Sequence, residues 1–298
     1  MPCFDRRSLI GASASLGLLG ACSSLSARAG ALRRDPFTLG VAAGDPTPDG
    51  FVIWTRLAPD PLAPAGGMAP GPVPVAWEVA ADAGFRDIVR SGEGLALPQA
   101  AHSLHVEVSG LAAQRPYWYR FHAGGAASET GCARTLPAPG AALDQLHIAS
   151  VGCHDYESGF FTAFAHLARE PMLDAVFHYG DYIYEFGRRA KNPLRVHAGD
   201  ETVTLDDYRR RYAQYKQDPD LRAAHARAAF ICSFDDHEVD DNWAGDWGKD
   251  GGATTVFAAR KAAALQAWYE HMPVRRALRP GSGARRLAMA KAPSTCEP

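Results

Sequence analysis

The chain contains the stretch Ala175-Val-Phe-His-Tyr-Gly-Asp-Tyr-Ile-Tyr-Glu185, an apolar run that stops abruptly at Gly180-Asp181. A short apolar run bounded by glycine predicts a buried β-strand rather than a helix. Two other runs have the same pattern: residues 146–151 lead into Gly152-Cys-His-Asp155, and residues 228–234 lead into Asp235-Asp-His-Glu238. Open α/β sheets bind their ligands beyond the carboxyl ends of the strands. We therefore predict three buried strands that bring metal-binding side chains to one edge of a sheet.

Composition excludes several classes of protein. The 298 residues carry a formal charge of −2, and 47% of them are hydrophobic, which is typical of a globular chain with room for two domains. A general nucleic-acid-binding protein would show a basic face, so we predict no nucleic-acid binding beyond a possible substrate. The six cysteines are too scattered for a disulfide scaffold, and no CxxC pair indicates structural zinc.

Residues 1–30 are predicted to be an export signal rather than part of the fold. A basic segment, Asp5-Arg-Arg-Ser-Leu-Ile10, precedes an apolar stretch that is too short to span a bilayer. The paired arginines resemble a twin-arginine signal, which implies the twin-arginine export machinery as a partner. We expect a periplasmic or extracellular protein. Lipid anchoring through Cys22 and ordinary cleavage after Ala29 both stay open.

Residues 36–136 are predicted to form a β-sandwich of the fibronectin or immunoglobulin kind. Short β-branched and aromatic runs, such as Phe51-Val-Ile-Trp-Thr55 and Tyr117-Trp-Tyr-Arg-Phe121, are separated by Gly and Pro without a helical period. Residues 137–143, rich in Pro and small side chains, are the predicted linker. No catalytic set of residues is evident in this domain.

Residues 144–276 alternate between strand and helix patterns, which predicts an α/β domain. Ser158, Thr204 and Asp218 are each placed to cap a helix, and Pro219 suits the first helical position. A fourth helical pattern runs from Thr254 to His271, and residues 277–298 form an irregular basic tail.

The residues at the three strand ends predict a site for two metal ions. Thiolate and phenolate together favour a strongly polarising ion such as Fe³⁺ or Zn²⁺, whereas carboxylate and amide oxygens suit Ca²⁺, Mg²⁺ or Mn²⁺. Asp181 stands between the two kinds of ligand and is the natural bridge. Such a pair orients a phosphate ester and generates hydroxide near neutral pH for in-line attack on phosphorus.

These residues resemble the PhoD-like alkaline phosphatases, which are exported metallophosphoesterases. The match includes Phe37–Pro46 and Val52–Leu57 in the amino-terminal module. In the catalytic domain it includes Ala149–Cys153, His178–Glu185, Tyr208–Tyr215 and Asp235–Trp243. The resemblance implies hydrolysis of phosphomonoesters or phosphodiesters by a metallophosphoesterase domain, of which residues 144–276 correspond to the first half.

Carried over position by position, the resemblance implies particular ligands. Cys153, Asp181 and Tyr184 would bind Fe³⁺, and Asp181 and Asn242 would bind Ca²⁺, with Zn²⁺, Mn²⁺ or Mg²⁺ as possible substitutes. Asp236 occupies the position of a metal-binding Asn in relatives of this fold, and His237 that of a phosphate-contacting histidine. Asp236 is thus a departure from the family pattern.

Other interpretations of these residues stay open. Cys153 could pair with Cys232 in an oxidising compartment, or could be the nucleophile of a thiol enzyme, inactivated by alkylation and not by chelators. His178 is expected to pack or to support a ligand rather than to bind a metal itself. Further candidates at the edge of the site are His154 and Asp155 and, as cations that attract phosphate or only face solvent, Arg188, Arg189 and Lys191.

Two functions of different classes follow from the carboxyl-terminal sequence. The family's catalytic domain would continue well beyond Arg276, which predicts a truncated or frameshifted reading frame that lacks the later ligands. The first function is an exported phosphoesterase, inactive if those ligands are needed. The alternative is a non-catalytic remnant in which the β-sandwich binds a partner and the incomplete α/β part exposes apolar surface.

Overall fold

The computed structural model describes residues 32, 34–189, 191–251 and 254–280. The predicted signal peptide with Cys22, and most of the predicted basic tail, lie outside these residues. None of the described helices combines the length and the apolar character needed to cross a membrane.

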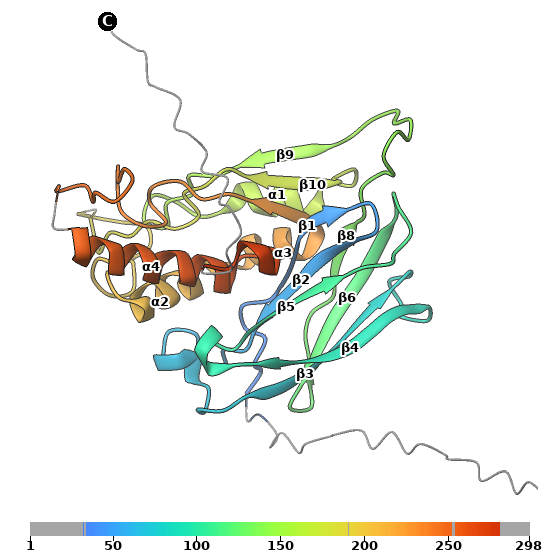
Figure 1. Ribbon diagram of the computed structural model, residues 1–298, viewed down its shortest axis with the longest axis horizontal. Helices are drawn as coiled ribbons and strands as arrows, with labels where there is room; N and C mark the ends of the chain where they lie inside the picture. The colour runs from blue at the N-terminus through green and yellow to red at the C-terminus, as the bar shows by residue number, and fades with distance from the viewer. Residues whose placement is uncertain (1–31, 33, 190, 252–253, 281–298) are drawn as a thin grey trace, which may run out of the picture.

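Eight strands in the first half of the chain form two β-layers that pack face to face (Figure 1). One layer contains β5, β2 and β1, in that order and antiparallel; the other contains β4, β3, β6 and β7, with β8 beside β6. The bounds are β1 Val41–Thr47, β2 Gly50–Arg56, β3 Val73–Ala80, β4 Ile88–Ala96, β5 Ser103–Val108, β6 Pro116–Ala123, β7 Ala126–Ala127 and β8 Gly131–Arg134. Short 3₁₀ turns interrupt the chain at Pro64–Gly67, Pro98–Ala100 and Arg276–Leu278.

Alternation of side chains explains how the two layers meet. Every second residue of β6 is buried, which places Tyr117, Tyr119 and Phe121 on the inner face. Phe51 of β2 faces them from the other layer, with its ring centroid 6.3 Å from that of Tyr117 and 6.4 Å from that of Tyr119. The core of this half is therefore aromatic and contributed by both layers.

The second half of the chain adds three parallel strands, β9 Ile148–Val151, β10 Ala175–His178 and β11 Ala229–Cys232. These are the three strands predicted from the apolar runs. They are neighbours in the order β11-β10-β9, and His178 lies opposite both Val151 and Cys232. The three strands therefore end level with one another, so the loops that follow them start at one edge of the sheet.

One hydrogen-bonded sheet crosses the predicted boundary between the domains. β1 pairs with β11 in parallel, Ala43 opposite Ala229, so that six strands run in the order β5-β2-β1-β11-β10-β9 (Figure 1). The sequence predicts two units joined by residues 137–143, and strand β1 pairs both with β2 of the first unit and with β11 of the second. Local patterning could not reveal this pairing, because the partners are almost 190 residues apart.

Among the described residues, four helices pack around the parallel part of the sheet: α1 Thr162–Arg169, α2 Leu205–Lys216, α3 Pro219–Arg227 and α4 Thr254–His271. The caps predicted for α2 and α3 are confirmed, since Thr204 and Asp207 form a capping box and Asp218 accepts from two backbone N–H groups. The cap predicted at Ser158 is wrong. The Ser158 hydroxyl donates instead to Asp155 at 2.8 Å, and α1 begins at Thr162.

Candidate metal centre

A buried glutamate joins the loops that follow β10 and β11. One carboxylate oxygen of Glu238 accepts the N–H of Asp181 at 3.1 Å and that of Asp235 at 2.8 Å, and the other accepts the N–H of Tyr182 at 2.6 Å. Glu238 is fully buried, and burial raises its pKa to about 8. This carboxyl group holds the Asp181 and Asp235–Asn242 loops together although they lie far apart in the sequence.

Three of the predicted metal ligands have left-handed backbone conformations. The φ angle is 52° at Cys153, 52° at Asp181 and 56° at Asn242. Residues other than glycine adopt this region at a cost of roughly 1–3 kcal/mol, and such residues cluster at active sites and ligand clamps. Gly180 has a φ of 131°, and a Cβ there would lie only 2.5 Å from the backbone nitrogen of Asp235. The loops therefore approach so closely that only glycine fits before Asp181.

Cys153, Asp181 and Tyr184 make up one side of the site. The Cys153 thiol donates to one oxygen of Asp181 at 3.1 Å. Burial, reinforced by the charge of Asp181, raises the pKa of the Cys153 thiol to about 11 and also raises that of the Tyr184 phenol. Burial raises the pKa of Asp181 as well. The charge of Asp181 thus raises the pKa of both Cys153 and Tyr184, and a cation bound beside them would lower both values again, so these groups suit a cation.

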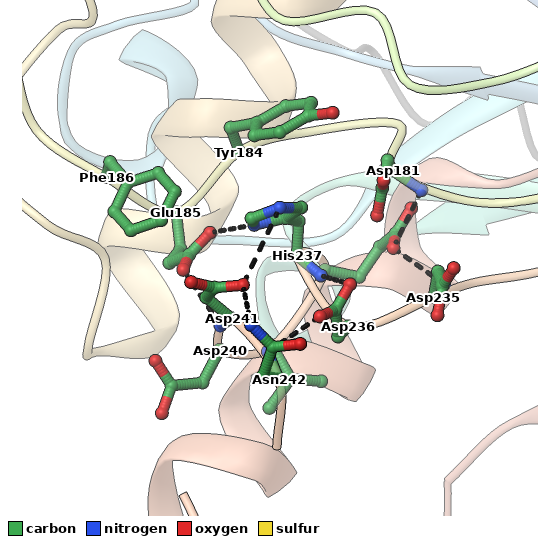
Figure 2. A network of polar contacts seen from close by, with 12 residues as sticks. Asp181, Tyr184, Glu185, Phe186, Asp235, Asp236, His237, Asp240, Asp241 and Asn242 are labelled. Carbon is green, nitrogen blue, oxygen red and sulfur yellow. Dashed lines mark hydrogen bonds and ion pairs between the residues drawn. The ribbon is translucent and has the colours of Figure 1, made fainter. Parts of the chain in front are cut away.

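Asp181, Asp236 and His237 make up the other side, where each offers a ligand atom within 4.8 Å of the others. The second Asp181 oxygen, Oδ1, is buried and has no hydrogen-bond partner in the described part of the chain. Asn242 lies next to Asp236 and donates its backbone N–H to the Asp236 carboxylate at 2.6 Å (Figure 2). Asp181 thus belongs to both sides, and its unpaired oxygen together with this mixed set of donors fits the predicted pair of metal ions.

His237 is held at the centre of the second side (Figure 2). Its Nδ1 lies 2.8 Å from a carboxylate oxygen of Glu185, and its ring centroid lies 4.2 Å from that of Tyr184. Burial by itself would lower the pKa of His237, but the hydrogen bond to Glu185 and the charges of Asp181 and Asp236 raise it to about 9. The ring is therefore suited to face a negatively charged group.

The remaining candidates lie around this centre. His178 is buried, with its Nε2 3.3 Å from Nδ1 of His154, and neither histidine is part of the cluster formed by Asp181, Asp236 and His237. Asp155 forms an ion pair with Arg189 at 2.7 Å, and that guanidinium lies 4.1 Å from the ring centroid of Phe186. Arg189 is therefore not simply a solvated loop cation.

Some features of the site differ from the sequence expectations. Cys153 and Cys232 are both free thiols, so the suggested disulfide between them does not form. The sequence patterns did not predict a role for Glu185 or Glu238, although both side chains bond to residues of the site. Each glutamate stands in a motif that is otherwise apolar or rich in predicted ligands, but such a pattern does not show that the side chain is buried.

Two family models match this chain. A family model of PhoD-like phosphatases matches residues 148–290, and a model of the amino-terminal domain of PhoD-like phosphatases matches residues 23–137. The chain belongs to the PhoD-like phosphatase family.

Individual relatives agree with this assignment. Alkaline phosphatase D of Bacillus subtilis (strain 168) is 46% identical over 284 residues, which are 91% of this chain and 48% of the relative. A solved structure described as that of PhoD is 49% identical with a TM-score of 0.82, over 85% of this chain and 49% of the other. The chain therefore shares the fold of that protein and spans about half the length of each of these two relatives.

Proposed function

We propose that the protein is an exported, metal-dependent phosphoesterase that hydrolyses phosphomonoesters or phosphodiesters. The observation that carries the proposal is the position of Asp181. One of its carboxylate oxygens accepts a hydrogen bond from the Cys153 thiol, and the other is buried beside Asp236 and His237 without a hydrogen-bond partner among the described residues. The similarity to a protein named alkaline phosphatase D supports phosphate esters as the substrate class.

The residues divide into two groups by the ions they suit. Cys153, Tyr184 and Asp181 would hold Fe³⁺, and Asp181, Asn242 and Asp236 would hold Ca²⁺, with Zn²⁺, Mn²⁺ or Mg²⁺ as substitutes. Such a pair, when bound, orients the ester and lowers the pKa of water for attack on phosphorus. His237, which lies next to Asp236 and has a raised pKa, donates a hydrogen bond to a phosphate oxygen and stabilises the charge that develops there.

The proposal includes the finer organisation of the chain. Residues 36–136 would be a fibronectin-like sandwich, and residues 144–276 the amino-terminal part of a metallophosphoesterase domain. Export through the twin-arginine machinery rests on the sequence of residues 1–30, which lie outside the described residues.

A thiol mechanism is less consistent with the surroundings of Cys153. A nucleophilic cysteine needs a lowered pKa, whereas burial and Asp181 raise the pKa of Cys153 to about 11. The non-catalytic alternative is favoured by one observation. Within the described part of the chain β9 is an edge strand, and its first residue, Ile148, is 52% exposed, while Leu146 just before it is 49% exposed. Such an edge suits association with another chain.

The test combines elemental analysis with turnover of p-nitrophenyl phosphate and bis-p-nitrophenyl phosphate. We expect iron and calcium to copurify with the protein, and chelators to abolish turnover. Cys153→Ser should lose iron and activity, whereas Cys132→Ser, which changes a free cysteine in β8, should keep both. Absence of both metals and of turnover would contradict the proposal and favour the non-catalytic alternative.

A further inference from the structure

Arg189 lies at the rim of the candidate metal centre and joins two of its loops. Its Nη2 donates to Asp155 at 2.7 Å, and its backbone N–H donates to a carboxylate oxygen of Glu157 at 2.9 Å. Asp155 and Glu157 belong to the loop that follows β9, whereas Arg189 belongs to the loop that follows β10. The position of this arginine is therefore set by two loops that also carry predicted metal ligands.

Aromatic rings fix the plane of the Arg189 guanidinium. Its Cζ lies 4.1 Å from the ring centroid of Phe186 and 5.6 Å from that of Tyr184. Both rings also contact the imidazole of His237, with centroids 5.4 and 4.2 Å from it (Figure 2). Stacking uses the face of a guanidinium and leaves its hydrogen-bonding edge for other partners. Arg189 is thus one ring away from the metal centre without belonging to it.

The guanidinium of Arg189 is open to solvent. Its side chain is 42% exposed, so a ligand in solution can reach it. A guanidinium has five N–H donors in a rigid fork, and the hydrogen bond to Asp155 does not use them all. The ion pair with Asp155, which is only 14% exposed, therefore holds the arginine in place and still leaves it able to bind an anion.

Two other cations of this region are less suited to meet a ligand. Arg195 is only 11% exposed, and each of its three nitrogens donates to an oxygen within the protein, at 3.1, 2.6 and 2.6 Å. Lys249 lies 5.3 Å from the ring centroid of Phe186, but it is paired with two carboxylates, at 2.8 and 3.3 Å. The comparison favours Arg189 as the cation that a substrate meets.

These contacts suit recognition of an anion outside the reacting phosphate. The planar fork of a guanidinium matches the two oxygens of a carboxylate or a phosphate. A side chain that a carboxylate and an aromatic face already hold loses little conformational freedom when it binds a ligand. Because Asp155 offsets the positive charge, the contact depends on direct hydrogen bonds more than on long-range attraction.

We propose that Arg189 is a specificity residue that binds a negatively charged oxygen group on the alcohol part of the phosphate ester. The preferred substrates are then esters whose alcohol part carries an acid, and neutral esters of the same size react more slowly. The effect on turnover rests on the proposed phosphoesterase function, whereas the effect on ligand binding does not.

The kinetic test compares two chromogenic substrates of nearly equal size, 3-carboxy-4-nitrophenyl phosphate and 3-carbamoyl-4-nitrophenyl phosphate. Arg189→Gln should lower the ratio of their kcat/KM values by about 5-fold, near the upper limit for a partly exposed ion pair. Arg189→Lys, which lacks the planar fork, should keep part of the preference. Arg134→Gln in β8 is the matched control and should keep the wild-type ratio, because Arg134 is 41% exposed and pairs with Asp174 at 3.2 Å.

The ratio distinguishes recognition from support of the loops. If Arg189 only held the loops together, Arg189→Gln would slow both substrates alike, and the ratio would stay at the wild-type value. Such a result would overturn the proposal.

A binding experiment separates the role of Arg189 from the phosphoesterase function. The ligands are 3-carboxybenzylphosphonate and 3-carbamoylbenzylphosphonate, which have no ester bond to hydrolyse, and calorimetry measures their affinities for the protein as purified. Arg189→Gln should weaken binding of the carboxylate about 5-fold and leave the amide unchanged, and added salt should reduce the difference. If the wild type turns over neither ester, the phosphoesterase function is contradicted and the affinities alone decide. Equal affinities of the wild type and Arg189→Gln for the carboxylate would overturn the proposal.

Discussion

One layer of the sandwich, β5-β2-β1, continues into the strands β11, β10 and β9, yet the sandwich and the edge formed by the ends of these three strands are built differently. In the sandwich, residues 36–136, no carboxylate is fully buried, although burial raises the pKa of the half-buried Asp45, and the hydrophobic core is aliphatic and aromatic. At the strand ends, Asp181, Glu185 and Glu238 are all buried, and the two glutamates bond to the backbone of the site loops. Left-handed residues occur in both regions, but at the strand ends they coincide with predicted ligands. We infer that the sandwich mainly stabilises the fold. The strand ends keep buried carboxylates and left-handed residues, which cost stability, because these groups serve binding.

The largest effect should come from the sandwich core. Phe51→Ala removes a fully buried ring that packs on Tyr117 and Tyr119, and should lower the free energy of unfolding by about 3–5 kcal/mol. Urea unfolding measures it, with Phe160→Ala as the control, because Phe160 is 62% exposed and should cost less than about 0.5 kcal/mol. Equal losses for the two variants would show that the sandwich core does not dominate stability.

The next effect concerns Lys216, a buried cation where the two regions meet. Its Nζ lies 4.5 Å from the ring centroid of Trp54 in β2 and 5.2 Å from that of Tyr182, which follows Asp181. Burial lowers the pKa of Lys216 to about 7, although the charge of the neighbouring Cys232 would raise it. Lys216→Met should therefore stabilise the protein by about 1–4 kcal/mol near pH 6.

The sign of the pH dependence follows from the same pKa. Between pH 7 and the ordinary lysine value of 10.5, the unfolded chain binds more protons than the folded one, so wild-type stability rises with pH over this window. The advantage of Lys216→Met over the wild type should accordingly shrink as the pH rises from 7 to 10.5. Urea unfolding of both proteins across this range is the measurement, and an advantage that does not change with pH would contradict the assignment.

A smaller loss is expected from Gly180→Ala. The added Cβ would lie 2.5 Å from the nitrogen of Asp235 in a backbone conformation that favours glycine, so the Asp181 loop must move at a cost of roughly 1–3 kcal/mol. Metal content should fall with stability. Gly159→Ala is the control, because a Cβ there meets nothing within 4 Å. Retention of full metal content by Gly180→Ala would argue against close loop packing as a requirement for binding.

The smallest effect is a gain. Cys153→Gly relieves the strain of the left-handed backbone at Cys153, which is roughly 1–2 kcal/mol. The greater conformational entropy of glycine in the unfolded chain cancels part of this gain in stability. We expect stabilisation of up to about 1 kcal/mol with loss of iron. Ser150→Gly in strand β9 should instead destabilise by about 0.5–1 kcal/mol. A loss of stability in metal-free Cys153→Gly would contradict the claim that the left-handed backbone at Cys153 destabilises the fold.

Local sequence patterns predicted much of the α/β part. The three apolar runs are neighbouring parallel strands, and helix α2 begins at the predicted Thr204 cap. The rest depends on contacts between residues far apart in the sequence. Pairing of β1 with β11 is set by the packing of the whole molecule, and Ser158 is not a cap because α1 begins only at Thr162, with Phe161 at the cap position.

The site was predictable to the level of its chemical groups. Cys153 follows strand β9 and Asp181 follows strand β10, and their side chains form a hydrogen bond. Asp181 also lies beside Asp236 and His237. Their roles as ligands stay predictions. The supporting carboxylates Glu185 and Glu238 could not be identified, because a glutamate in a motif has the same local pattern whether it faces solvent or a buried histidine.

The proposed function depends most on Asp181 being shared by two ions. Iron and calcium per chain, measured by elemental analysis, should be present in the wild type and in Asp49→Asn, a control at an exposed turn of the sandwich. Asp181→Asn should lose both metals, because the carboxylate adjoins the Cys153 side and the Asp236 side alike. Retention of both metals by Asp181→Asn would contradict the account.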